Sequence, residues 1–138
     1  MAKFCIAAGI VLAASVAMPA AQAASKPARS TGAPTNATGV SSYKQYTSSL
    51  GTLHLRVGTY VSHKYYWARV SSPGSTLNSD YNLHLIVSGP NGYKVIETVD
   101  INRTTYTAAY SIKSGYTYKA CWSKKSSELT EKCLSTTA

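Results

Sequence analysis

The chain has 138 residues, of which 14 are lysine or arginine and 5 are aspartate or glutamate, so its formal net charge is +9. This length corresponds to about one ordinary domain and excludes a multidomain enzyme. Eleven Tyr, two Trp and a large stock of Ser and Thr favour β-strands. Five carboxylates leave little material for acid–base catalysis. We therefore expect an all-β protein that is not an enzyme and that uses no cofactor.

Residues 1–23 have the features of a secretory signal peptide. Lys3 precedes an apolar, Ala-rich stretch, and residues 21–23 (Ala-Gln-Ala) match a small-x-small cleavage site. A transmembrane anchor needs about 20 apolar residues, and this stretch is shorter and ends near Pro19. We expect a secreted protein without a membrane span.

Residues 24–50 are rich in Ser, Thr, Ala, Gly and Pro and contain no acidic residue. Because such a segment cannot bury a core by itself, the sequence predicts a flexible, extended arm. This arm is either a passive spacer or a segment that becomes ordered on a protein partner, for instance by adding a strand to it. The candidate partner-binding residues of the arm are Lys26, Arg29, Val40, Tyr43, Lys44, Tyr46 and Leu50.

Residues 51–138 are predicted to form an antiparallel β-sandwich. Leu53, Leu55 and Val57 alternate with polar residues, which is the pattern of a strand with one buried face. Similar segments recur about every ten residues and give about seven or eight strands. The strands predicted in this way cover residues 53–57, 60–70, 83–87, 93–99, 104–111, 116–122 and 129–134.

Turn sequences predict two hairpins within this domain. Residues 89–92 (Gly-Pro-Asn-Gly) are expected to join strand 83–87 to strand 93–99. Residues 112–115 (Ile-Lys-Ser-Gly) are expected to join strand 104–111 to strand 116–122.

Cys121 and Cys133 form an even pair once Cys5 leaves with the signal peptide, and in an oxidising compartment we expect them to be joined as a disulfide. They are symmetric about Ser127, so a turn there places them across from each other on neighbouring strands. The indole rings of Trp67 and Trp122 are expected in the core.

The sequence offers little support for catalysis or metal binding. His54, His63 and His84 share no close spacing, so solvent-facing strand histidines are expected rather than zinc ligands. No Gly-x-Ser-x-Gly turn supports a Ser-His-Asp triad. A protease-inhibitor loop over residues 71–78 is permitted by its Pro-Gly turn but is not specifically indicated.

The charge pattern allows two interpretations: a basic exterior either only keeps the protein soluble or also attracts an anionic partner. No acidic residue precedes Asp80, so the N-terminal half is purely cationic and would attract an anionic partner. Exposed strand tyrosines would suit a protein or a glycan, and buried ones would only stabilise the sheet. Candidate partners are secreted proteins and anionic envelope polymers or glycans, whereas nucleic acid is not expected because no binding motif occurs.

The leader, the Ser/Thr-rich arm and residues 114–122 (Ser-Gly-Tyr-Thr-Tyr-Lys-Ala-Cys-Trp) followed by Cys133 resemble small secreted β-sandwich proteins of filamentous actinobacteria. The likeness covers roughly residues 58 to 134. The layout of an arm before a sandwich is also similar to the adaptor subunits of umbrella toxin particles. That resemblance implies an arm that docks into a larger toxin subunit and a sandwich that holds a lectin-like subunit. An adaptor is therefore the first functional hypothesis, and an envelope-binding or antimicrobial protein is the second.

Overall fold

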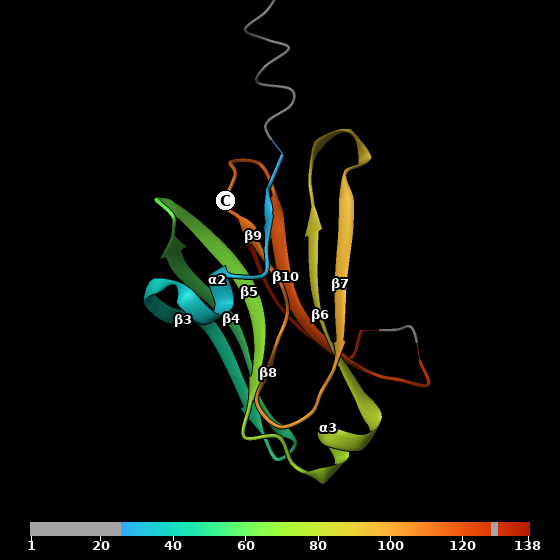
Figure 1. Ribbon diagram of the computed structural model, residues 1–138. Coiled ribbons are helices and arrows are strands. Elements are labelled where there is room, and N and C mark those ends of the chain that lie inside the picture. Colours follow the sequence, from blue (N-terminus) through green and yellow to red (C-terminus); the bar gives the residue numbers. More distant parts are fainter. Residues whose placement is uncertain (1–25, 128–129) are drawn as a thin grey trace, which may run out of the picture.

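The computed structural model describes residues 26–127 and 130–138, which form two antiparallel β-sheets packed face to face (Figure 1). The predicted fold class, an all-β antiparallel sandwich, is confirmed. The described residues contain ten strands rather than seven or eight, because short and N-terminal strands were not anticipated. The predicted signal peptide over residues 1–23 lies outside the described residues, as do residues 24 and 25.

The four-stranded sheet contains, in spatial order, β11 (Lys132–Thr137), β10 (Thr117–Lys124), β6 (Tyr81–Ser88) and β7 (Lys94–Asp100). The six-stranded sheet contains β2 (Arg29–Ser30), β9 (Ala109–Ser111), β5 (His63–Ser71), β4 (Gly51–Tyr60) and β3 (Thr38–Ser48), with β8 (Thr105–Tyr106) also paired to β5. The helical segments among the described residues are α2 (Ala33–Asn36), α3 (Ser75–Asp80) and the 3-10 turn η2 (Pro90–Gly92).

The main core lies between the two sheets and follows the alternation of the sequence. Leu53 and Leu55 on β4 point inward, as do Leu83 and Leu85 on β6, and all four are fully buried. The indole of Trp122 belongs to the same core, as predicted. Burial of this apolar area between the sheets is the main source of stability for a fold of this kind.

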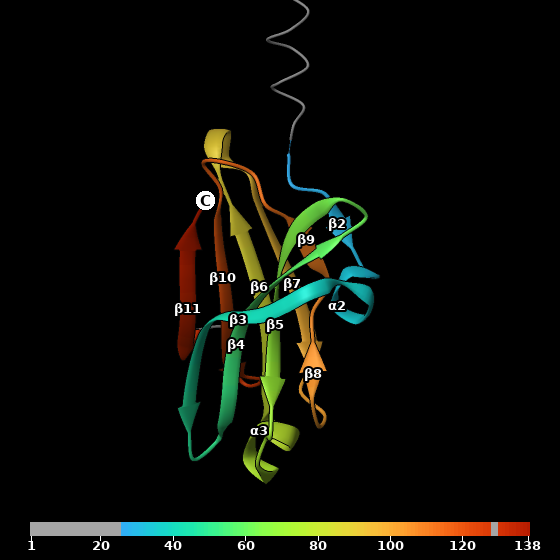
Figure 2. The ribbon, with the colours of Figure 1, turned by 90° about the vertical axis from the view of Figure 1, so that its left-hand side faces the viewer.

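The predicted arm is wrong for residues 26–50, because this segment is part of the sandwich. β3 pairs with β4 along its length and forms an edge of the six-stranded sheet, and β2 pairs with β9. α2 and the start of β3 cross the outer face of this sheet, as Figure 2 shows. The segment has few apolar residues of its own, but it becomes ordered by covering apolar residues that β4 and β5 leave exposed.

A second, smaller core explains this ordering. The indole of Trp67 lies on the outer face of the six-stranded sheet, yet it is buried, because Ala33, Ala37 and Val40 pack against its cluster. Gly58 lets these groups come close, since a Cβ at this position would lie 2.9 Å from Val40 Cγ2 and 3.1 Å from Trp67 Cη2. The sequence correctly predicts that Trp67 is buried, but the group that covers it is found only in the structure.

One predicted hairpin is confirmed and the other is wrong. β6 and β7 pair across residues 89–92 without a register shift. In contrast, residues 104–111 do not pair with residues 116–122, because β9 joins the six-stranded sheet through β5 and β2, whereas β10 lies in the four-stranded sheet. Residues 112–115 therefore connect the two sheets instead of forming a tight hairpin within one.

Cys121 and Cys133 form the predicted disulfide. They are directly opposite each other in the β10–β11 pair, with a Cα–Cα distance of 4.1 Å. The hairpin placement inferred from their symmetry about Ser127 is therefore confirmed. Cross-linking the last two strands stabilises the fold mainly by restricting the unfolded chain.

Candidate functional site

The turn between β4 and β5 has an unfavourable backbone for its sequence. Tyr60 and His63 are paired, so Val61 and Ser62 form a two-residue turn with φ angles of 48° and 66°. Turns of this type favour Asn-Gly, because a β-branched residue at positive φ is strained. Val61 is nevertheless 72% exposed, so the strained residue presents its apolar side chain to solvent. Strain of this kind is often found at functional sites.

A cationic pocket of about 270 Å³ lies beside this hairpin tip. β5 supplies His63, Lys64 and Tyr65, the segment before β2 supplies Lys26 and Ala28, and the end of β9 with the next residues supplies Ser111, Ile112 and Lys113. The pocket is at the end of β5 farther from α3, since β5 runs from His63 toward that helix (Figure 1). We call this set of residues the cationic pocket.

Backbone hydrogen bonds bring the three chain segments of the cationic pocket together. Ser111 N donates to Ala28 O at 2.9 Å, and Ala28 N donates to Ser111 Oγ at 2.7 Å. Ile112 N donates to Lys64 O at 2.9 Å. The basic side chains are therefore mounted on backbone that is held by both neighbouring segments.

The four-stranded sheet also supports the cationic pocket, through Tyr118. Its hydroxyl donates to Ser111 O at 2.7 Å and accepts from Lys113 N at 2.8 Å. The Tyr118 side chain is fully buried, and burial raises the pKa of its hydroxyl to about 12. It therefore remains a neutral hydrogen-bonding group that fixes the loop carrying Lys113.

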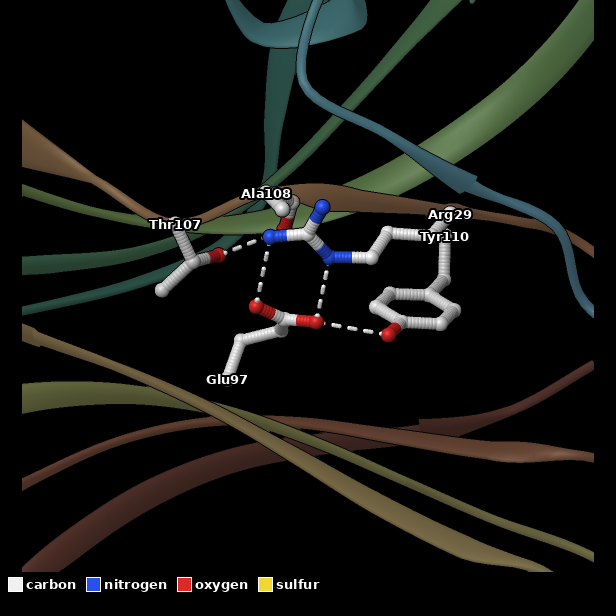
Figure 3. A network of polar contacts seen from close by, with 5 residues as sticks. All are labelled: Arg29, Glu97, Thr107, Ala108 and Tyr110. Atoms are coloured by element: carbon white, nitrogen blue, oxygen red, sulfur yellow. Dashed lines mark hydrogen bonds and ion pairs between the residues drawn. The ribbon is translucent and has the colours of Figure 1, made fainter.

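An ion pair fastens the segment that leads from the pocket into β2 (Figure 3). Arg29 Nε donates to Glu97 Oε2 at 2.7 Å, and the Tyr110 hydroxyl donates to the same oxygen at 2.6 Å. These contacts join β2 and β9 of one sheet to β7 of the other. The hydrogen bond from Arg29 is the main cause that lowers the pKa of Glu97. We call this group the inter-sheet clasp.

Among the described residues, the lining of the cationic pocket contains three lysines and a histidine but no carboxylate. Within residues 26–127 and 130–138, the ion pairs are Arg29–Glu97 and Lys125–Asp100, and neither involves a lysine of the pocket. The charges of these lysines have the same sign, so they would attract an anionic group that approaches the pocket.

The predicted partner-binding residues mostly make contacts within the protein. Arg29 belongs to the clasp, Val40 packs in the second core, and Tyr46 and Leu50 pack against the main core. Lys44 Nζ donates to Ser135 O at 2.6 Å. Lys26 lines the cationic pocket and lies 5.8 Å from the centre of the Tyr93 ring. Tyr43 keeps an exposed side chain, so Lys26 and Tyr43 are the members best placed to contact a partner.

The prediction of solvent-facing histidines is wrong for His54, which is only 6% exposed. Its Nδ1 lies 2.7 Å from Ser42 Oγ and its Nε2 lies 2.6 Å from Ser71 Oγ. Burial, followed by the charges of Arg69 and Arg56, lowers the pKa of His54 to about 4. The two serine hydroxyls satisfy both nitrogens of a neutral imidazole. Because the ring is enclosed, these contacts form a buried polar network rather than a catalytic serine–histidine pair that a substrate can reach.

His84 repeats this arrangement on the other sheet. Its Nδ1 lies 2.9 Å from Thr98 Oγ1 and its Nε2 lies 2.7 Å from Ser123 Oγ. Because His54 is on β4 of one sheet and His84 is on β6 of the other, these two histidines do not converge. Among the residues that the structure describes, no group of three or more His, Cys, Asp or Glu side chains is placed to hold a metal ion.

Most strand tyrosines are buried, so the sheet-stabilising alternative applies to them. Tyr66 packs against Tyr118 with ring centres 4.9 Å apart, and Tyr93 packs against Tyr116 at 5.4 Å. Exposed side chains are retained by Tyr43 and Tyr106. The sandwich therefore offers little of the aromatic platform that glycan stacking requires.

The loop proposed for protease inhibition is not a free loop. Its second half belongs to α3, where the Leu77 side chain is fully buried. In the described part of the chain, no helix has the length and apolar character needed to cross a membrane.

Comparison of the chain with protein-family models, curated proteins and solved structures finds no match.

The cationic pocket as a unit is not predicted from the sequence. The lack of acidic residues before Asp80 is evident there, but the meeting of residues 26, 63–65 and 111–113 is not. The lack of acidic residues before Asp80 was the signal available in the sequence. The pairing of β9 with β2 and β5, which brings the basic residues together, is seen only in the structure.

Proposed function

We propose that this protein is a secreted, non-enzymatic interaction module that binds an acidic surface of a protein partner through the cationic pocket and the adjoining hairpin tip. The single observation that carries the proposal is a pocket whose described lining residues include three lysines and a histidine but no carboxylate. The signal-peptide features of residues 1–23 and the Cys121–Cys133 disulfide support export into an oxidising compartment.

A protein partner is favoured over a glycan for two reasons. The strained turn places the exposed Val61 next to the basic residues His63 and Lys64, and an apolar contact beside charged ones is typical of protein interfaces. Most tyrosines that would stack on sugars are buried. The resemblance to toxin adaptors supplies a setting in which the partner is a larger subunit of an extracellular complex.

The pocket replaces the arm in this proposal. Residues 26–50 contribute to both cores and to an edge strand, so their release from the sandwich would expose Trp67 and separate β3 from β4. An adaptor that uses this segment as a free tether would lose that burial. Binding by the folded pocket has no such cost.

The test is a pull-down of the tagged protein from its native culture supernatant at low and moderate salt, followed by mass spectrometry. We expect a stoichiometric acidic protein that K64Q/K113Q fails to retain. The matched control is K124Q/K125Q, which removes the same charge beside α3 and should retain the partner. If both variants lose the partner equally, binding depends on net charge and not on the cationic pocket. If only envelope polymer is recovered, the protein is an envelope-binding protein, as in the second hypothesis.

A further inference from the structure

β7 is a regular edge strand with no described strand beyond it. Among the described strands it pairs with β6 alone, and Figure 1 shows it at the margin of the four-stranded sheet. Long open edges are usually interrupted or covered, because they can pair with another chain. The other long edges have such features, since β3 contains two register shifts and Lys44 Nζ reaches Ser135 O on β11. β7 has no register shift and no proline.

Hydrogen bonds at both ends of the β6–β7 pair show which backbone groups of β7 are free. Gly89 N donates to Tyr93 O, and Ile101 N donates to Tyr81 O. Hydrogen-bonded residues alternate along an antiparallel pair, so the odd-numbered residues of β7 bond to β6. The even-numbered residues therefore present their N–H and C=O groups to the open edge.

The outward-facing residues of β7 are complementary to a second copy of themselves. They are Lys94, Ile96, Thr98 and Asp100. If two β7 strands meet antiparallel around a two-fold axis at Glu97, each Lys94 lies opposite Asp100 of the other copy, and each Ile96 lies opposite Thr98. The even-numbered residues then face each other as hydrogen-bonded pairs, so this register satisfies the free backbone groups as well as the charges.

The same register also matches the side chains that point between the sheets. Val95 lies opposite Val99 of the second copy, and both are half-buried residues that pack against the main core. Ile96, whose side chain is 54% exposed, comes near its own symmetry mate on the outer face. The unfavourable pair is Glu97 with itself, and the clasp offsets this because Arg29 binds each carboxylate.

We propose that β7 is a homodimerisation edge at which two copies pair antiparallel in the register that sets Lys94 against Asp100, forming a continuous eight-stranded sheet from two four-stranded sheets. In the single chain, Asp100 meets Lys125 Nζ only at 3.8 Å in an exposed pair. Such a pair contributes little and does not compete strongly for Asp100.

The test is sedimentation equilibrium of the purified protein over a wide concentration range, with a charge-reversal cycle. K94D and D100K each convert two attractive contacts into repulsive ones, so each single variant should weaken the dimer roughly 10- to 100-fold. The double variant K94D/D100K restores opposite charges across the interface and should return the dissociation constant to near the wild-type value.

A matched control variant separates the effect of the β7 edge from that of net charge, and a folding check accompanies every variant. K119D makes the same charge change on the exposed face of β10, away from the edge, and should leave the dimer unchanged. Circular dichroism checks that each variant is folded. A wild-type protein that stays monomeric up to its solubility limit would overturn the proposal, as would a double variant no better than the single ones.

Discussion

Acid should destabilise this protein well above the range in which carboxylates titrate, because its most enclosed histidine is held neutral. His54 has a pKa of about 4 in the fold, against an ordinary value of 6.5. Burial is the largest cause, and Arg69 and Arg56 add to it. The unfolded chain therefore takes up a proton at this residue before the folded protein does.

The sign and size of the effect follow from this difference. Above pH 6.5 His54 is neutral in both the folded and the unfolded state, so it does not reduce the free energy of unfolding. Between pH 6.5 and 4 only the unfolded chain is protonated at this residue, so the free energy of unfolding falls. Below pH 4 both states are protonated and this contribution no longer changes. Each pKa unit corresponds to about 1.4 kcal/mol, so a depression of this size sets a ceiling of about 3 kcal/mol. Partial access of solvent to the network reduces the expected loss to about 1–2 kcal/mol.

Urea denaturation at several pH values between 7.5 and 4 tests the prediction, with His54→Gln as the comparison. The wild type should lose stability steadily below pH 6.5, whereas the variant should show a flatter profile. The pH slope is compared rather than stability at one pH, because the substitution also alters the contacts with Ser42 and Ser71. An unchanged slope in the variant would refute the assignment to His54. His84, whose pKa is also lowered by burial, would account for slope that remains.

Two further predictions concern backbone geometry and packing, both measured by chemical denaturation. V61N/S62G should stabilise the protein by about 1–2 kcal/mol, because Asn-Gly adopts the positive φ angles of this turn without strain, and no gain would argue against stored strain. Gly58→Ala should cost about 1–3 kcal/mol, because the added Cβ would lie 2.9 Å from Val40 Cγ2. Gly74→Ala is its control, with 3.5 Å to the nearest atom, and an equal loss there would contradict the packing argument.

Local patterns in the sequence were sufficient for the parts of the fold that depend on neighbouring residues. The alternation around Leu83 and Leu85, followed by a Gly-Pro-Asn-Gly turn, predicts the β6–β7 hairpin, because strand faces and tight turns are set within a few residues. The spacing of Cys121 and Cys133 likewise predicts the last hairpin and its disulfide. The absence of acids before Asp80 indicates a basic surface that could attract an anionic partner.

Only the tertiary structure decides how segments distant in sequence are shared between the two sheets. Residues 26–50 resemble a free arm because their apolar residues are few and scattered. Three of these residues, Ala33, Ala37 and Val40, nevertheless fit over Trp67. The cationic pocket also depends on pairing between distant segments. It forms because β9 pairs with β2 and β5 and not with β10, the strand that follows it in the sequence. The periodicity of a segment shows which of its faces is apolar, but it does not show which distant segment will cover that face and bury it.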